Sequence, residues 1–252
     1  MRVLVTRPMP DAETTAEDLR RRGHAPIIAP MLQTVFRDWP GTARADIPDA
    51  LIATSLNGIR GLERAPMLGK WLSLPLYVPG EASAAYGRAV GFSDVRPVHG
   101  DAEAIGARIV ADVPSGARLL YVAGADRSGA LDARLRHKGY HVDLVEIYRA
   151  DPAERLPEAA VDAIRAGEID RILVFSARTA TVLSICLKAS DLLPVSRAIH
   201  IHAISKQAAA PLIEAGFASI VVARRPDAAE LLDTLEAELS PAFNAKDAPR
   251  ET

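Results

Sequence analysis

Residues 142–150, Val-Asp-Leu-Val-Glu-Ile-Tyr-Arg-Ala, set the strongest limit on how this chain folds. We expect a strand here, because a helix stops at Gly139 just before it and Asp151-Pro152 follows it. No turn signal folds this strand back on its neighbours in sequence. A second extended run of the same character covers residues 32–37. We predict that the two runs pair as a narrow ladder joining two α/β lobes, with Tyr148 in the cleft between them.

Strand and helix patterns alternate on both sides of this segment. The expected strands cover residues 2–6, 25–31, 50–54, 76–78, 95–98, 118–122, 171–175, 199–204 and 219–223. The expected helices cover residues 11–22, 55–64, 81–90, 101–110, 129–138, 158–166, 177–189, 206–215 and 228–239. Such alternation predicts α/β lobes with doubly wound parallel sheets, connected by right-handed crossovers.

Counting strands predicts how the chain is divided. Three strands follow the crossing segment, and the two N-terminal strands bring that sheet to five. We therefore assign residues 1–31 and 152–239 to one discontinuous lobe and residues 50–141 to the other. Residues 32–37 and 142–150 are the connecting ladder. Residues 240–252 are polar and contain two prolines, so we expect a disordered tail.

Composition excludes several classes of protein. The chain is 49% hydrophobic but only 5% aromatic, which favours aliphatic packing in layers. Its net charge of -2 gives no basic surface for nucleic acid. The single cysteine, Cys186, lies in an apolar run and fits a core residue in a reducing compartment. A first strand at Arg2 leaves no room for a signal peptide, and no apolar run reaches the roughly 18 residues that span a membrane. We expect a cytoplasmic protein.

Ligands of open parallel sheets bind beyond the carboxyl ends of the strands, where loops enter helices. Several helix N-termini with neighbouring basic residues would suit a ligand with many carboxylates. The alternative is that each serine at such a turn only caps its helix. The candidate ligand-binding residues are Arg7, Ser55, Ser83, Arg127, Ser176, Arg178, Ser205 and Lys206.

Common cofactor and metal motifs are missing from the sequence. Residues 124–129 have the outer glycines of a phosphate loop, but Ala130 stands where its lysine belongs. His137 and His141 are separated by Gly139, and His200 and His202 lack an obvious carboxylate partner. We therefore expect neither a cofactor nor a metal.

Taken together, the motifs of the chain resemble those of uroporphyrinogen-III synthases. Each motif is short, and their order and spacing carry the resemblance over nearly the whole length. They are Leu4-Val-Thr-Arg-Pro8, Ile52-Ala-Thr-Ser55, Gly80-Glu-Ala-Ser-Ala84, Gly91-Phe92, Glu146-Ile-Tyr-Arg149, Phe175-Ser176 and Ala203-Ile-Ser205.

The resemblance implies a cofactor-free enzyme of porphyrin and heme biosynthesis, a lyase that cyclises hydroxymethylbilane with inversion of its last pyrrole and loss of water. This linear tetrapyrrole carries eight carboxylates, and we expect a monomer that acts on it without membrane or nucleic-acid partners. Tyr148 matches the family's tyrosine, which assists departure of the hydroxyl. A phenol with a pKa of about 10 is protonated at neutral pH and can donate that proton. The alternative is a half-buried strand tyrosine that only packs.

Two positions depart from the family pattern. Ser83 stands where threonine is common, and Ser205-Lys-Gln-Ala208 replaces a turn that often carries threonines. The second change puts a hydroxyl contact there in doubt and offers Lys206 as a carboxylate contact. A rival function is a non-catalytic binding or regulatory protein that has kept the fold.

Overall fold

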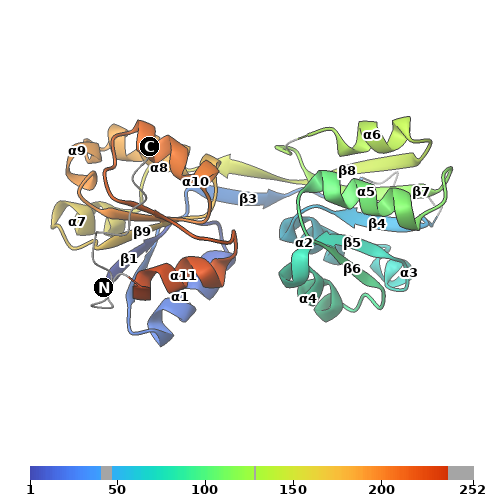
Figure 1. The fold of residues 1–252 in the computed structure, drawn as a ribbon, viewed down its shortest axis with the longest axis horizontal. Coiled ribbons are helices and arrows are strands. Elements are labelled where there is room, and N and C mark those ends of the chain that lie inside the picture. The colour runs from blue at the N-terminus through green and yellow to red at the C-terminus, as the bar shows by residue number, and fades with distance from the viewer. Residues whose placement is uncertain (41–46, 128, 238–252) are drawn as a thin grey trace, which may run out of the picture. The chain divides into compact units, whose positions relative to one another are not determined.

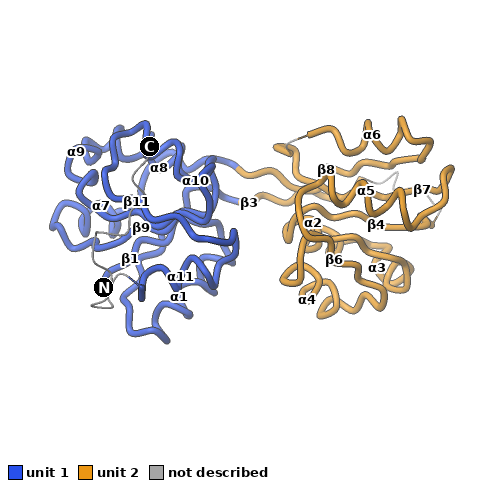
Figure 2. The backbone as a smooth tube through the Cα atoms, viewed as in Figure 1, with its two compact units in different colours: residues 1–33, 151–252 blue, residues 34–150 orange. Residues whose placement is uncertain are grey.

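The computed structural model describes residues 1–40, 47–127 and 129–237. It contains two compact units, shown in Figure 2: unit 1 is Met1–Gln33 with Asp151–Thr252, and unit 2 is Thr34–Ala150. The chain therefore passes from one unit to the other twice, after Gln33 and after Ala150. The tail expected over residues 240–252 lies outside the described residues.

Unit 1 is built on a five-stranded sheet in the order β11-β10-β9-β1-β2 (Figure 1). Its strands are β1 (Arg2–Val5), β2 (Ala25–Ile28), β9 (Arg171–Val174), β10 (His200–Ala203) and β11 (Ile220–Val222). All four pairings are parallel, with Val3 opposite Arg171 and Ile201 opposite Ile172. The N-terminal strands thus pair with strands from the far end of the chain.

Helices cover both faces of this sheet. They are α1 (Asp11–Arg21), α7 (Glu158–Arg165), α8 (Ala177–Ala189), α9 (Leu193–Ser196), α10 (Lys206–Glu214) and α11 (Ala228–Ala237). In Figure 1, α1 and α11 lie on one side of the sheet and α7 to α10 on the other. Leu19 of α1 and Leu231 of α11 share a buried cluster with Val3 and Val5 of β1. Burial of these aliphatic side chains is the main term that holds the layers together.

Unit 2 is built on a six-stranded sheet in the order β3-β8-β7-β4-β5-β6. Its strands are β3 (Leu32–Phe36), β4 (Ala50–Ala53), β5 (Leu76–Pro79), β6 (Val95–Val98), β7 (Arg118–Gly124) and β8 (His141–Pro152). Four pairings are parallel. The exception is β3 with β8: backbone hydrogen bonds join Arg37 to Ile147 and Ala153 to Met31, so these two strands run antiparallel.

The sheet of unit 2 is wider than the sequence predicted. We expected four strands there, with residues 142–150 outside the sheet, but β8 pairs in parallel with β7 from His141 onward. The physical reason is that Val142 and Val145 fill the two cores on opposite faces of the sheet. A strand that is apolar on both faces is stable only inside such a layered sheet.

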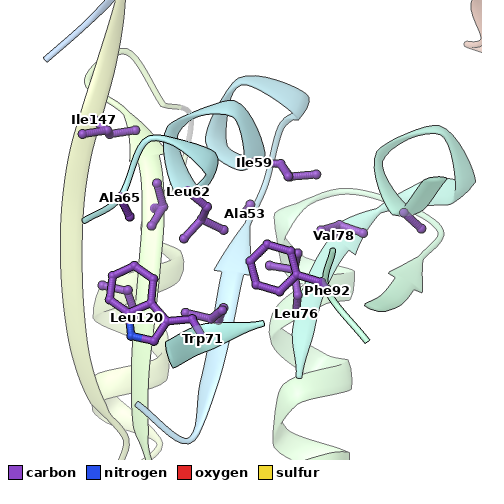
Figure 3. Close-up of a cluster of buried hydrophobic side chains, with 13 residues drawn as sticks. Ala53, Ile59, Leu62, Ala65, Trp71, Leu76, Val78, Phe92, Leu120 and Ile147 are labelled. Atoms are coloured by element: carbon purple, nitrogen blue, oxygen red, sulfur yellow. The ribbon is translucent and has the colours of Figure 1, made fainter. Parts of the chain in front are cut away.

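Unit 2 also has helices on both faces: α2 (Leu56–Glu63), α3 (Leu68–Trp71), α4 (Gly80–Val90), α5 (Ala102–Asp112) and α6 (Leu131–His137). Figure 3 shows the core under α2 to α4, which gathers Leu62, Trp71 and Phe92 around the sheet. The opposite core contains Ile105 and Leu135 from α5 and α6.

The doubly wound α/β class and all the longer expected elements are confirmed. Among the described residues, element ends differ from the expected ones by at most three residues, and β6 and α8 begin and end where the sequence predicted. The short helices α3 and α9 were not expected, because four residues make barely one turn and show no periodic pattern.

Candidate functional site

Tyr148 lies at a β-bulge, where the register between β7 and β8 shifts. Ala123 is opposite Glu146, but its neighbour Gly124 is opposite Tyr148, so Ile147 is the extra residue. Regular alternation would place Glu146 and Tyr148 on one face and Ile147 on the other. With the extra residue, Ile147 and Tyr148 both pack against the α2 side of the sheet, whose buried cluster is shown in Figure 3.

The ring of Tyr148 is held from two sides. A Cβ placed on Gly124 would lie 2.7 Å from both Cε2 and Cζ of Tyr148, so the ring lies directly over this glycine. The ring of Phe36 on β3 is 6.1 Å away, centroid to centroid, and tilted by 52°. The guanidinium carbon of Arg64 in turn lies 4.6 Å from the centroid of the Phe36 ring. The phenol therefore has a fixed direction.

The hydroxyl of Tyr148 meets the start of α2. Its oxygen is 2.8 Å from Oγ of Ser55, the N-cap residue of that helix. Oγ of Ser55 also accepts a hydrogen bond from the Gly58 N–H at 3.1 Å. One residue earlier, Oγ1 of Thr54 is 3.0 Å from the hydroxyl of Tyr121. The two hydroxyl residues at the end of β4 thus each hold a tyrosine.

Burial raises the pKa of Tyr148 above the ordinary value of a phenol, and the nearby Tyr121 and Asp126 raise it further. The hydrogen bond with Ser55 acts in the opposite direction and lowers the pKa, but by less than burial raises it. Tyr148 is therefore protonated at neutral pH, and its chemical capacity there is to donate a proton.

Arg127 follows β7 at the same edge of the sheet. Its guanidinium pairs with the carboxylate of Glu146, and Arg37 lies 3.8 Å from the other oxygen of that carboxylate. The Nε atom of Arg127 is buried and has no hydrogen-bond partner among the described residues. Glu146, which lies two residues before Tyr148 on β8, thus holds the guanidinium of Arg127 in place.

Unit 1 carries most of the remaining predicted residues. Ser176 and Ser205 cap α8 and α10, accepting hydrogen bonds from the backbone N–H groups of Thr179 and Ala208. They follow the neighbouring strands β9 and β10, so both caps lie at one edge of the sheet. Arg178 and Lys206 are exposed in the first turns of these helices.

Arg7 lies in the turn after β1, the strand next to β9. Its guanidinium stands 4.4 Å from the ring centroid of Phe175, 3.4 Å from the Asp11 carboxylate and 3.2 Å from Oγ1 of Thr15. These contacts fix the side chain, which is partly buried.

Ser83 is not a helix cap, contrary to one of the two interpretations offered for it. Helix α4 begins at Gly80, whose φ of 63° turns the chain sharply out of β5, and Pro79 precedes it. Ser83 therefore falls at the end of the first turn, where its side chain is buried. Contact between Ser83 and a ligand stays a prediction.

The structure thus groups the predicted residues by unit. Ser55, Tyr148 and Arg127 lie at the carboxyl edge of β4, β7 and β8 in unit 2. Arg7, Ser176, Arg178, Ser205 and Lys206 lie at the carboxyl edge of β1, β9 and β10 in unit 1. Neither Gly124 nor Phe36 was predicted from the sequence to belong to the site. Gly124 was considered only as part of a phosphate loop, although an isolated glycine at the end of a strand also signals close packing.

Neither a metal-binding cluster nor a membrane-spanning helix occurs in the described part of the chain. Within residues 1–40, 47–127 and 129–237, no three His, Cys, Asp or Glu side chains are grouped so that they could hold a metal ion. Among the helices of those same ranges, none is long and apolar enough to cross a membrane.

Comparison with known proteins identifies relatives of the chain. The family model described as uroporphyrinogen-III synthase HemD matches residues 13–233. A mutant uroporphyrinogen III synthase from Thermus thermophilus is 20% identical, with a TM-score of 0.60 over 95% of this chain and 98% of that one. Uroporphyrinogen-III synthetase from Helicobacter pylori is 18% identical, with a TM-score of 0.62 over 95% and 100% of the two chains. No curated protein sequence matches the chain significantly. At these identities, the two structures show a shared fold.

Proposed function

The chain belongs to the uroporphyrinogen-III synthase family, and on that basis we propose a role for each residue of the site in the family's reaction. That reaction closes hydroxymethylbilane into a ring, inverts the last pyrrole and releases water. The observation that carries the proposal is Tyr148, a phenol fixed over Gly124 and kept protonated by burial.

Tyr148 donates its proton to the departing hydroxyl group. The bond between the terminal methylene carbon and oxygen breaks, its electron pair goes to oxygen, and the proton from Tyr148 completes a water molecule. The lone pair of the pyrrole nitrogen replaces the lost electrons at carbon, so a weak acid is sufficient. The substituted carbon of the last pyrrole, which is attacked first, carries no hydrogen and instead gives up its bond to the neighbouring methylene. That methylene then bonds to the unsubstituted carbon of the same pyrrole, and the hydrogen on this carbon leaves as the proton that restores the phenol.

The substrate's carboxylates bind to basic side chains and helix N-termini. Arg127 in unit 2, and Arg7, Arg178 and Lys206 in unit 1, supply positive charge, while the first turns of α8 and α10 supply backbone N–H groups. A protein with a net charge of -2 can bind an anion in this way because the positive groups are local.

Orientation supplies the larger part of catalysis. Unassisted closure joins the free ends of the tetrapyrrole without inversion, so the enzyme must hold the last pyrrole with its substituted carbon towards the reactive methylene. Fixing two reacting groups in one geometry is worth several powers of ten in rate. Several separate carboxylate contacts suit that task better than one strong contact.

We also propose that the protein works as a monomer in the cytoplasm. Both groups of site residues come from a single chain, and the one cysteine is a buried free thiol, as in proteins of reducing compartments. The division into residues 1–31 with 152–239, a ladder of 32–37 and 142–150, and 50–141 belongs to the same proposal. In that division Tyr148 lies on a connecting strand.

The test is to incubate the protein with freshly generated hydroxymethylbilane, oxidise the products and separate the porphyrin isomers. We expect isomer III in excess over the isomer I formed in a parallel sample with heat-denatured protein. Exclusive formation of isomer I would contradict the proposal and favour the non-catalytic alternative, which no present observation supports.

A further inference from the structure

The hydroxyl group of Ser55 has two partners in the structure. Its oxygen accepts a hydrogen bond from the Gly58 N–H and lies 2.8 Å from the oxygen of Tyr148. A serine hydroxyl has one proton and two lone pairs. The cap uses one lone pair, so the proton and the second lone pair remain available to Tyr148. Ser55 can therefore accept from the phenol or donate to it without giving up the cap.

We propose that Ser55 is a positioning residue for Tyr148 and is not a ligand of the substrate. This inference rests on the proposed function and changes the role that the sequence predicted for Ser55. The serine hydroxyl fixes the phenol oxygen before the reaction. After Tyr148 has given its proton to the leaving group, the same hydroxyl donates to the tyrosinate oxygen.

The number of protons on the two hydroxyl groups supports the proposal that Ser55 donates to the tyrosinate. The neutral phenol can donate to Ser55, whereas a tyrosinate oxygen can only accept. When the C–O bond of the substrate breaks and the Tyr148 proton leaves with the water, the hydroxyl of Ser55 needs only to rotate. The tyrosinate then also lies at the N-terminus of α2, where backbone N–H groups stabilise negative charge.

Comparison with the other serine caps shows that this contact is not a general property of the turn. Ser55, Ser176 and Ser205 have nearly the same backbone angles, with φ between -156° and -161° and ψ between 157° and 164°. The Oγ of Ser176, however, lies 2.8 Å from Oγ1 of Thr179 in its own helix. A serine cap with these backbone angles can therefore find a second hydrogen-bond partner within its own helix. The contact of Ser55 with Tyr148 does not follow from the cap geometry.

A double-mutant cycle tests whether Ser55 acts through Tyr148. We expect Ser55→Ala to lower kcat roughly 10-fold, at the low end of general acid catalysis, with KM changed less than about twofold. In the Tyr148→Phe background the same substitution should cause no further loss beyond about twofold, since residues that act as a unit are not additive. Additive losses with a raised KM would show that Ser55 binds substrate and would overturn the proposal.

The variant Asp101→Ala is the control for the effect of losing a helix cap. Asp101 caps α5 in the same unit, accepting from the N–H groups of Glu103 and Ala104, and it lies outside the site. We expect this variant to lose a comparable amount of stability and to keep its kcat. If Ser55→Ala does not fold, Ser55→Gly also removes the hydroxyl and keeps a tolerated cap.

A second measurement needs no substrate. In ligand-free protein labelled with 13C at tyrosine Cζ, Ser55→Ala should move the titration of Tyr148 to higher pH, and Ser55→Thr should leave it near that of the wild type. An unchanged titration in Ser55→Ala would overturn the proposal. Because this measurement does not involve turnover, a wild-type protein that formed only isomer I would refute the proposed function separately from the Ser55–Tyr148 pair.

Discussion

Gly124 lies opposite Tyr148 at the register shift between β7 and β8, and the tyrosine ring covers the space that a side chain at position 124 would fill. The missing Cβ is therefore a requirement of the site. A methyl group there would be 2.7 Å from two ring atoms and 2.9 Å from the phenol oxygen, which real contacts of this kind do not tolerate.

Gly124→Ala should displace the ring and break the hydrogen bond to Ser55. We expect a loss of about 1–3 kcal/mol in the free energy of unfolding, the usual cost of overpacking, together with a lower kcat. Denaturant titration and the isomer assay measure the two effects. Gly69→Ala is the matched control, because a Cβ on Gly69 in α3 would meet no atom within 4 Å. Equal stability of both variants would show that the ring adapts without cost.

Tyr148→Phe should lower turnover roughly 10- to 1,000-fold, at or below the usual range for general acid catalysis. The product should remain mainly isomer III, because the contacts that hold the carboxylates are unchanged. Rate and isomer ratio are measured in the same assay. Full activity would make Tyr148 a packing residue, and mostly isomer I from a variant that still binds substrate would assign it an orienting role.

Arg127→Gln should raise KM roughly 3- to 30-fold, which corresponds to one charge-assisted hydrogen bond. The increase should shrink at higher ionic strength, because salt screens the attraction between the arginine and a substrate carboxylate. Arg134→Gln is the control: Arg134 also pairs with a glutamate in unit 2, Glu103, but lies outside the site. A similar rise of KM in both variants would point to general surface charge.

His202 predicts a loss of stability in mild acid. Its side chain is fully buried in β10, and its Nδ1 lies 2.7 Å from Oγ1 of Thr234, which donates to the Leu231 carbonyl at 2.6 Å. Nδ1 must therefore be the donor of a neutral imidazole. Burial lowers the pKa of His202 to about 4, with smaller contributions from Arg171 and His200.

The sign follows from the protons bound in each state. Between pH 6.5 and about 4, the unfolded chain binds a proton at this histidine and the folded protein does not. The contribution of neutral His202 to the free energy of unfolding is therefore complete above pH 6.5 and is lost progressively as the pH falls towards 4. We expect His202 alone to account for about 3 kcal/mol over that range. Denaturant titrations at several pH values measure how the free energy of unfolding depends on pH. This dependence should be flatter for His202→Asn than for a variant of the exposed His99. Identical slopes would contradict the prediction.

The sequence was sufficient to predict the layered architecture for a definite reason. Apolar strands such as residues 50–53 and amphipathic helices such as α8 carry their burial pattern in their own few residues. The width of the unit 2 sheet could not be read in this way, because pairing of β8 with β7 depends on two segments meeting in space.

The candidate site was less accessible to sequence reasoning. Ser55 and Tyr148 were both selected, but from different arguments, and nothing local indicates that residues 93 positions apart share a hydrogen bond. The bulge at Ile147 was also invisible, since regular alternation places Tyr148 on the wrong face of the sheet. The capping interpretation of Ser83 was wrong because Pro79, after the strand, precedes the first helical residue Gly80, so Ser83 already lies inside α4.

The order of strands in unit 1 has a consequence for synthesis of the protein on the ribosome. Strand β1 pairs with β9, where Val3 lies opposite Arg171. The sheet of unit 1 therefore cannot form until residues around Arg171 have left the ribosome. Unit 2 is one continuous segment and can fold while the nascent chain is still growing. During that interval residues 1–33 lack three of the five strands of their sheet and leave the apolar edge of β1 open. An open apolar strand edge promotes aggregation, so these residues are exposed to it for longer than the continuous segment of unit 2.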